Sequence, residues 1–361
     1  MSHNPHVFVG PKPRIGVIGG GHLGRIHAKL AAANPACELI GVADPSDASR
    51  QFVQGQLNIA AITNYCEWLG AVDGVIVAAP TFLHHEIGLW CLNHGIHVLM
   101  EKPVASTLIE ANQLVSAAKA NHRTLQVGHV ERFNPAWRLA SSQFSSNSIR
   151  YIEASREGTY TGRSTDIGIV MDLMIHDIDL ILSAVDAPVE SVAAYGWNVL
   201  GKTEDFATAS LCFRNGTIAN LRASRVAVSP RRTMQVFTDE GLTEIDFATN
   251  TVTQTAAVED VANGSRQADA LPAELRAKVK DSLFADWLNR VEQKATPANA
   301  IEQEQMEFFR AIQTGSSVTV TGDQGCQALE VASRILEQIA INQPIRSIIP
   351  AADRFTKTKA A

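Results

Sequence analysis

Residues 14–44 read RIGVIGGGHLGRIHAKLAAANPACELIGVAD, and this stretch decides the fold of the N-terminal half. The apolar run Arg14–Gly19 predicts a short buried strand that meets glycines at once. Leu23–Ala33 predicts a helix, and Glu38–Asp44 predicts a second buried strand. Strands that are apolar throughout and alternate with helices indicate a parallel sheet covered on both faces.

The same alternation continues as far as residue 128. Further strands are expected at Ala71–Ala79, Ile96–Met100 and Thr124–Gly128, with helices at His84–His94 and Leu108–Asn121. This order predicts a Rossmann domain, a doubly wound α/β unit with a parallel sheet, over residues 1–135.

A different pattern begins near residue 148 and predicts a second domain over residues 136–361. A strand is expected at Ile149–Ser155, a long helix at Ile167–Ala184, and then two hairpins with turns at Asn215-Gly216 and Glu240-Gly241. These features predict an α+β domain built on a mostly antiparallel sheet. Further expectations are a loop at Val258–Ala270 and helices at Pro272–Lys294, Ala300–Thr314 and Asp323–Asn342, the last packing back on the first domain.

Length and composition narrow the class of protein. A chain of 361 residues suits two domains, and a net charge of -6 argues against a nucleic-acid or anionic-membrane partner. The five cysteines are far apart and form no CxxC pair, which is typical of free thiols. Met1–Pro13 lacks the features of a signal peptide, and no stretch reaches the ~18 apolar residues of a membrane span. We therefore expect a cytoplasmic protein without a metal site.

The glycine run after the first strand has the spacing of a dinucleotide-binding loop. Gly19, Gly21 and Gly24 form a GxGxxG motif that includes His22 and Leu23. The first glycine permits a tight turn, the second lets the backbone approach a pyrophosphate, and the third lets helix and strand pack closely. The free N–H groups at the helix N-terminus then favour the phosphates.

Asp44, at the end of the second strand, indicates which dinucleotide binds. A carboxylate there accepts hydrogen bonds from the adenine ribose hydroxyls and repels a 2′-phosphate. No arginine follows it directly, so NAD is expected rather than NADP, although Arg50 is near enough to leave NADP open.

Several later motifs, taken in order with the glycine loop, carry a family resemblance. They are Pro80-Thr81 with His84 after the third strand, Glu101-Lys102-Pro103 after the fourth, GHVERFNP at 128–135 after the fifth, and Asp172 with His176 on the first helix of the second domain. Together they resemble the glucose–fructose oxidoreductase / inositol dehydrogenase (Gfo/Idh/MocA) family over nearly the whole chain.

The resemblance implies that Lys102 lies near the nicotinamide and the reacting hydroxyl, and that its bond to Pro103 is commonly cis. It also places Pro80, Thr81, His84, Glu101 and Lys102 at the cofactor. The position agrees with a general rule, because ligands of open α/β sheets bind at the carboxyl ends of the strands. The charge of Lys102 would hold the substrate oxygen and stabilise its alkoxide character. The alternative is a solvated charge at a strand end.

Asp172 and His176 are four residues apart, so on an α-helix they share one face. Histidine is suited to proton exchange near neutral pH, and alcohol oxidation needs an acceptor for the hydroxyl proton. The family resemblance makes His176 the general acid/base, with Asp172 as its orienting partner or a ligand of a substrate hydroxyl. Asp179 competes for the orienting role. The alternatives are an ordinary polar helix face and a metal site, but no third ligand is apparent.

The sequences GHVERFNPA and DIGIVMDLMIHDIDL resemble one branch of the family, the nucleotide-sugar 3-dehydrogenases that act on UDP-N-acetylglucosamine. The resemblance places Arg132 and Asn134 in the substrate pocket. Arg163 is a candidate for the diphosphate, since a guanidinium suits phosphate, or else a loop charge. His129 either lines the nicotinamide pocket or is a core histidine. The single Gly168 departs from the family, which often has several glycines before this aspartate.

The preferred hypothesis is therefore an NAD-dependent enzyme that oxidises C3 of UDP-N-acetylglucosamine or a related nucleotide sugar. One alternative keeps the chemistry but takes a free sugar or inositol as substrate. Another is a cofactor-binding sensor without activity. A sheet with helices on one face only would also favour a homodimer or homotetramer.

Overall fold

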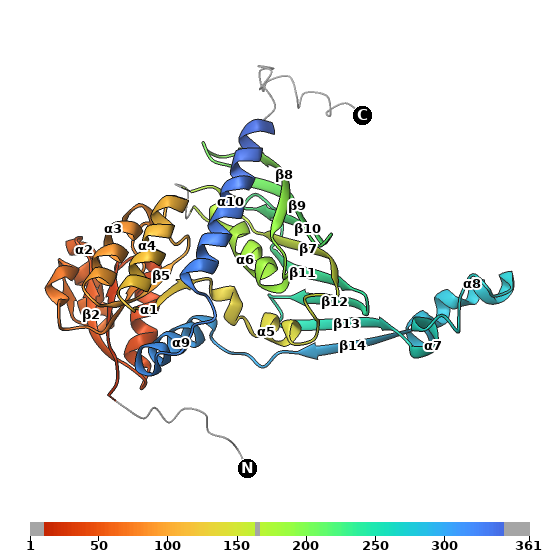
Figure 1. Ribbon diagram of the computed structural model, residues 1–361, viewed down its shortest axis with the longest axis horizontal. Helices are drawn as coiled ribbons and strands as arrows, with labels where there is room; N and C mark the ends of the chain where they lie inside the picture. Colours follow the sequence, from red (N-terminus) through yellow and green to blue (C-terminus); the bar gives the residue numbers. More distant parts are fainter. Residues whose placement is uncertain (1–10, 163–166, 343–361) are drawn as a thin grey trace, which may run out of the picture.

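The computed structural model describes residues 11–162 and 167–342, which form two sheets joined through helices (Figure 1). The first sheet is six-stranded and wholly parallel, in the order β3-β2-β1-β4-β5-β6. Its strands are β1 (Arg14–Ile18), β2 (Glu38–Ala43), β3 (Ala61–Ile62), β4 (Gly74–Val77), β5 (His97–Glu101) and β6 (Leu125–Gly128). Its helices are α1 (His22–Ala33), α2 (Asp47–Leu57), α3 (His84–Asn93) and α4 (Leu108–Ala120).

The strand order explains where a ligand can bind. Strands β1 and β4 are neighbours although two other strands separate them in the chain, so the winding reverses between them. Ligands of doubly wound sheets bind at this switch point, beyond the carboxyl ends of the strands. The glycine loop after β1 lies at that point. Strands β4 and β6 are buried at every residue, as expected for a sheet covered on both faces.

The second sheet is eight-stranded, in the order β14-β13-β12-β11-β7-β10-β9-β8, and only the β7–β10 pair is parallel. Its strands are β7 (Ile149–Glu157), β8 (Val189–Trp197), β9 (Phe206–Phe213), β10 (Ile218–Ser224), β11 (Arg231–Thr238), β12 (Gly241–Asp246), β13 (Thr251–Ala257) and β14 (Leu288–Lys294). The predicted fold class, a Rossmann sheet followed by a mostly antiparallel α+β unit, is confirmed.

Helices cover one face of this second sheet and connect it to the first (Figure 1). They are α5 (Pro135–Ser141), α6 (Ile175–Ala184) and α10 (Gly322–Asn342). Helix α10 starts against the first sheet, where Gly325 lies on Val127, and continues over α6 and β8. Helix α9 (Ala300–Thr314) returns fully to the first sheet and buries Phe308 and Phe309 there. The domain boundary at residue 135 stays a prediction.

The segment predicted as one helix from Pro272 to Lys294 is different in the structure. Helix α8 (Ala273–Ser282) is followed by a π-helical turn, and then β14 pairs with β13 at the sheet edge. With α7 (Glu259–Ala262), α8 projects away from the body of the molecule (Figure 1). The charged residues of β14 have good helix propensity, but pairing with a neighbouring strand overrides that propensity.

Several other elements were not predicted from the sequence, among them α2, β8 and β13, and α7 lies in the segment 258–270 that was predicted as loop. Helix α2 begins at a Ser46 cap, whose side chain accepts a hydrogen bond from the Ser49 amide; this capping signal was present in the sequence. Strands β8 and β13 have little apolar alternation of their own and are defined by their partners, β9 and the β12/β14 pair.

Candidate active site

The glycine loop leaves backbone groups and space where a pyrophosphate would bind. Gly19 has φ +102°, and a Cβ there would lie 2.6 Å from the Ala78 carbonyl oxygen, which leaves room only for glycine. A Cβ on Gly24 would lie 1.8 Å from the Gly19 oxygen. A Cβ on Gly21 would meet nothing within 4 Å, and among the described residues no side-chain hydrogen bond caps helix α1, whose first residues are His22 and Leu23. The N-terminus of this helix, with its partial positive charge, therefore lies at the glycine loop, where an anion is favoured.

Asp44 lies at the end of β2 and binds the same loop. Its Oδ2 accepts from the Gly20 amide at 2.7 Å and its Oδ1 from the Ser46 amide at 2.8 Å. Arg50 is turned to other groups, because it donates to the Asp44 carbonyl oxygen and pairs with Asp47. Each carboxylate oxygen of Asp44 therefore keeps a lone pair that can accept a hydrogen bond from a ribose hydroxyl. No arginine of the described chain forms an ion pair with this carboxylate.

The loop after β4 connects the glycine loop to the segment that carries Lys102. Pro80 and Thr81 begin the short 3-10 turn that follows β4. His84 is buried, and its ring nitrogens lie 2.9 Å from the carbonyl oxygens of Ala79 and Pro103. Its role here is to join two loops, and a direct contact with the cofactor stays a prediction.

Lys102 lies at the carboxyl end of β5 and reaches across to the second domain. Its side chain is 14% exposed, and its Nζ donates to the backbone oxygen of Asp172 at 2.6 Å and lies 3.5 Å from the Asp172 carboxylate. The Lys102–Pro103 bond is cis, as the family resemblance implies. Burial lowers the pKa of the Lys102 amine below its ordinary value, against the opposing charges of Asp172 and Glu101.

Asp172 contacts Lys102 rather than His176, which differs from the orienting role expected from the sequence. The reason is local: residues Val170–Met174 form a π-helical turn before α6 begins, so the four-residue spacing is not that of a continuous α-helix. Asp179 also does not orient His176, because it faces Arg132 at 3.5 Å. Within the described residues, Nδ1 of His176 has no hydrogen-bond partner.

His176 stands beside His129, with ring centroids 6.4 Å apart and perpendicular planes. Burial, followed by the charges of Lys102 and Arg156, holds the pKa of His176 well below 6.5. Burial, with Lys102 and Arg132, lowers the pKa of His129 to about 3. Both imidazoles are therefore neutral near physiological pH. A neutral His176 with an unused nitrogen can accept a proton.

A buried charge network under the site was missed by the sequence interpretation. Arg156 on β7 binds the carboxylate of Asp177 through Nε and Nη2, the latter at 2.7 Å, and Glu131 through Nη1 at 2.7 Å. Asp177 adjoins His176, so this network anchors the start of α6. The available signal was the β7 alternation, which places Arg156 on the same face as Ile152 and Ala154 and thus in the core.

Three predicted substrate residues have other roles in the described structure or lie outside it. Arg132 is buried, faces Asp179, and donates to the Thr319 carbonyl oxygen. Asn134 caps α5 and donates to Glu131. Arg163 lies outside the described residues. Their contacts with substrate stay predictions.

The single glycine before Asp172 has a steric reason. A Cβ on Gly168 would lie 2.0 Å from a carboxylate oxygen of Glu204, and that carboxylate accepts from the Val170 amide at 3.1 Å. Glu204 therefore occupies the space beside Gly168 and holds the start of the π-helical turn that presents Asp172.

Comparisons with known proteins agree with this geometry. Residues 13–129 match the model of the oxidoreductase family with an NAD-binding Rossmann fold, and residues 137–244 match the GFO/IDH/MocA C-terminal domain. The UDP-N-acetylglucosamine 3-dehydrogenase of Acidithiobacillus ferrooxidans is 38% identical over 66% of this chain and 75% of its own length. The inositol 2-dehydrogenase of Rhizobium meliloti is 24% identical over 92% of this chain and 98% of its own.

Solved structures with similar folds come from the same kind of enzyme. The UDP-N-acetylglucosamine 3-dehydrogenase GnnA of Acidithiobacillus ferrooxidans superposes with a TM-score of 0.80 at 31% identity, covering 92% of this chain and 99% of that one. The WlbA dehydrogenase of Bordetella pertussis, solved with NADH and UDP-GlcNAcA, shares the fold, with a TM-score of 0.75 at 18% identity over 93% and 97% of the two chains. The chain therefore belongs to the GFO/IDH/MocA oxidoreductase family and is an NAD-dependent dehydrogenase acting on CH–OH groups.

Proposed function

We propose that this enzyme oxidises the C3 hydroxyl of UDP-N-acetylglucosamine, or of a closely related nucleotide sugar, to a 3-keto sugar. The observation that supports this substrate most strongly is the 38% identity to a UDP-N-acetylglucosamine 3-dehydrogenase. The site geometry supports the reaction class, because a buried amine and a neutral imidazole lie at the carboxyl end of the Rossmann sheet.

The residues divide the chemistry between them. NAD, when bound at the glycine loop and Asp44, supplies the acceptor for the hydride that leaves the carbinol carbon. Lys102 holds the substrate oxygen and stabilises its negative charge as the C–H bond breaks. His176 takes the hydroxyl proton, so the oxygen forms a carbonyl without releasing a free alkoxide. Asp172 keeps the Lys102 amine in place, since it offers both a carbonyl and a carboxylate oxygen.

The substrate assignment is tested by following NAD reduction with UDP-N-acetylglucosamine, its uronic acid, free N-acetylglucosamine, glucose and inositol. Turnover is expected with the UDP sugars, with loss of turnover when the uridine diphosphate is removed. If the enzyme prefers a free sugar or inositol, the proposed alcohol oxidation stands but the nucleotide-sugar substrate is wrong. In the same assay Arg163→Ala is expected to raise KM for the UDP sugar, as a phosphate contact would require.

The second sheet also supports a proposal on assembly. A surface hollow lies on the face of this sheet that the described helices leave uncovered, where strands present residues such as Tyr195, Arg222 and Gln235. We infer that this face pairs with a second copy of the chain in a homodimer or homotetramer, because an uncovered sheet face is readily shared in symmetric oligomers. Light scattering at micromolar concentration should give at least twice the subunit mass of 39.0 kDa. A monomer would contradict the proposal.

No helix of the described part of the chain is long and apolar enough to span a bilayer.

A further inference from the structure

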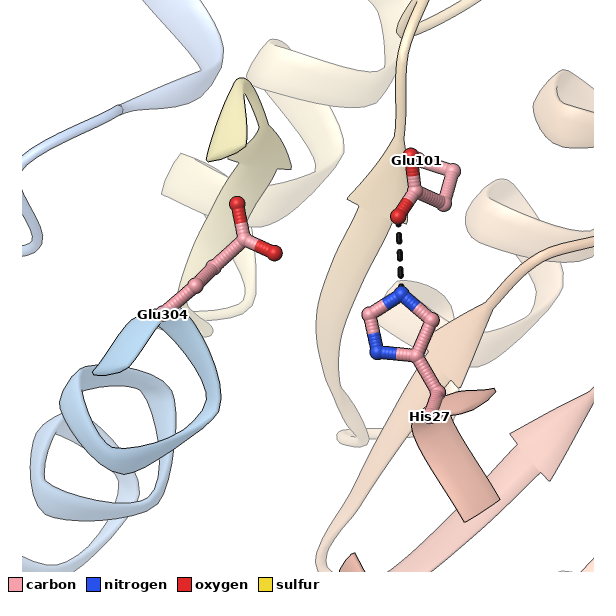
Figure 2. Close-up of side chains that lie close together, drawn as sticks. All are labelled: His27, Glu101 and Glu304. Atoms are coloured by element: carbon pink, nitrogen blue, oxygen red, sulfur yellow. Dashed lines mark hydrogen bonds and ion pairs between the residues drawn. The ribbon is translucent and has the colours of Figure 1, made fainter. Parts of the chain in front are cut away.

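Glu304 on helix α9 is a buried acid that the reaction does not use. It is 0% exposed, and neither of its carboxylate oxygens has a hydrogen-bond partner among the described residues. Its carboxyl end faces the pair formed by His27 of α1 and Glu101 of β5 (Figure 2). One nitrogen or oxygen of each of these three residues lies within 4.8 Å of the other two. A buried acid without a donor is costly, so this cluster needs an explanation.

The hydrogen bonds of His27 argue against a metal ion in the cluster. The amide nitrogen of Gln305 lies 2.9 Å from Nδ1 of His27 and 3.1 Å from its backbone oxygen, so it donates to both. Nδ1 of a neutral His27 is then the acceptor, and Nε2 carries the hydrogen that it donates to Glu101 at 2.8 Å. A metal needs a nitrogen lone pair, and both nitrogens of this ring are already committed.

The proton content of the two carboxyl groups follows from their donors. Both carboxylate oxygens of Glu101 accept hydrogen bonds, Oε1 from His27 at 2.8 Å and Oε2 from the Lys102 amide at 3.2 Å. Glu304 receives none. Two ionised carboxylates this close in a buried site would repel each other, so the second must be neutral.

We propose that Glu304 is a positioning residue that carries a proton at neutral pH and shares it with the Glu101 carboxylate, thereby holding the strand end that presents Lys102. The two carboxyl groups make no direct hydrogen bond in the described structure, so sharing the proton requires a rotation of Glu304 or one bridging water. Burial and the negative charges of Glu101, Glu307 and Asp179 raise the pKa of Glu304 well above 4.5, in agreement with this assignment. The kinetic consequence rests on the proposed function, whereas the protonation state does not.

The direct test of the proton does not depend on activity. Infrared difference spectra of the whole enzyme against Glu304→Gln should show the carbonyl stretch of a protonated carboxyl group near neutral pH in the wild type only. The matched control is Glu302→Gln, an exposed position on the same helix, which should leave this band unchanged. Burial raises the pKa of Asp179 to about 7, so its band is common to both proteins and cancels in the difference spectrum. Absence of a protonated-carboxyl band from the difference spectrum would overturn the proposal.

Thermal unfolding against pH gives an independent test through its sign. Above pH 4.5 the unfolded chain releases the Glu304 proton while the folded chain retains it, so the wild type loses stability relative to Glu304→Gln as pH rises. The Tm of the variant minus that of the wild type should therefore increase, by about 2 °C or more, between about pH 5 and about pH 8. A decrease, or a metal ion bound in the wild type and lost in the variant, would show an ionised Glu304 and reject the proposal.

Kinetics then test the positioning role. Glu304→Gln keeps a donor for Glu101 and should retain kcat within about threefold, whereas Glu304→Leu leaves Glu101 without it and should lower kcat about tenfold. Equal losses in the two variants would contradict proton sharing. If neither the wild type nor the variants turn over a UDP sugar, the substrate proposal fails while the infrared and unfolding results still decide the state of Glu304.

Discussion

The glycine loop and the proposed catalytic cluster of Lys102, Asp172 and His176 are built in opposite ways. The loop consists of backbone N–H groups from six consecutive residues, 19–24, between β1 and α1. The cluster consists of side chains from two separate parts of the chain, with Lys102 at the end of β5 and Asp172 and His176 on the helical segment 170–184 that covers the second sheet. The first part depends on local conformation and the second on how the domains pack. A substitution should therefore affect cofactor binding or chemistry, and rarely both.

The substitution His176→Ala is expected to give the largest difference between the effect on kcat and the effect on NAD binding. Removing the proton acceptor should lower kcat by about 10²–10⁴-fold. NAD affinity, measured by fluorescence or calorimetry, should change little. His176 lies on α6, which covers the second sheet, whereas the glycine loop belongs to the first. The control is His94→Ala, an exposed histidine at the end of α3. A large loss of NAD affinity in His176→Ala would break the distinction.

The substitution Gly24→Ala should do the reverse and weaken NAD binding without removing a group of the proposed catalytic cluster. The added methyl would lie 1.8 Å from the Gly19 oxygen, so the loop must move. Overpacking of this kind costs about 1–3 kcal/mol, and we expect NAD to bind roughly 10–100-fold more weakly. Gly55→Ala is the matched control, because a Cβ at Gly55 meets nothing within 4 Å. Unchanged NAD binding in Gly24→Ala would show that the loop is not the phosphate site.

The pH dependence of kcat/KM should report the catalytic cluster alone. His176 has a pKa well below 6.5, so it is neutral and active until the pH falls through that lowered value. Lys102 has a pKa below 10.5, so its charge is lost as the pH rises through that value. We expect a plateau around neutrality and limbs that fall about tenfold per pH unit beyond it. Gly24→Ala should keep the same limbs, and an acid limb at or above 6.5 would contradict the neutral His176.

The smallest expected effect is on cofactor choice. Asp44→Ala removes a carboxylate that already accepts from Gly20 and Ser46, so part of its role is structural. NAD should bind about 5–10-fold more weakly, while NADP, no longer repelled, should bind better than it does to the wild type. Titration of both cofactors measures the ratio. No change in that ratio would remove Asp44 from the recognition of the ribose.

Elements with a strong local signal were predictable, and those defined by partners were not. The buried strands β1, β4, β5 and β6 and the glycine loop were identified from apolar runs and glycine spacing, which depend on adjacent residues. The charged residues of β14 predict a helix, and only the pairing with β13 beside it makes this segment a strand.

The same division applies within the site. Motif, residue type and the family resemblance made Lys102, Asp172, His176 and Asp44 candidate site residues, and their roles stay predictions. Only the tertiary structure shows which charged side chains pair: Asp172 pairs with Lys102, and Asp179 pairs with Arg132. The physical reason is that burial forces every charge to find a partner, and the partner available depends on which elements pack together.

Arg156, His27 and Glu304 show this most clearly, because their neighbouring residues do not indicate which partners they meet. Arg156 is enclosed by Glu131 and Asp177, and Glu304 is brought to His27 and Glu101 from about 200 or more residues away along the chain. The sequence by itself determined the strands of the parallel sheet, the glycine loop and the candidate groups for the reaction, through local periodicity and spacing. Only the tertiary structure decided the charge partners and protonation states, because these depend on desolvation and on contacts between distant elements.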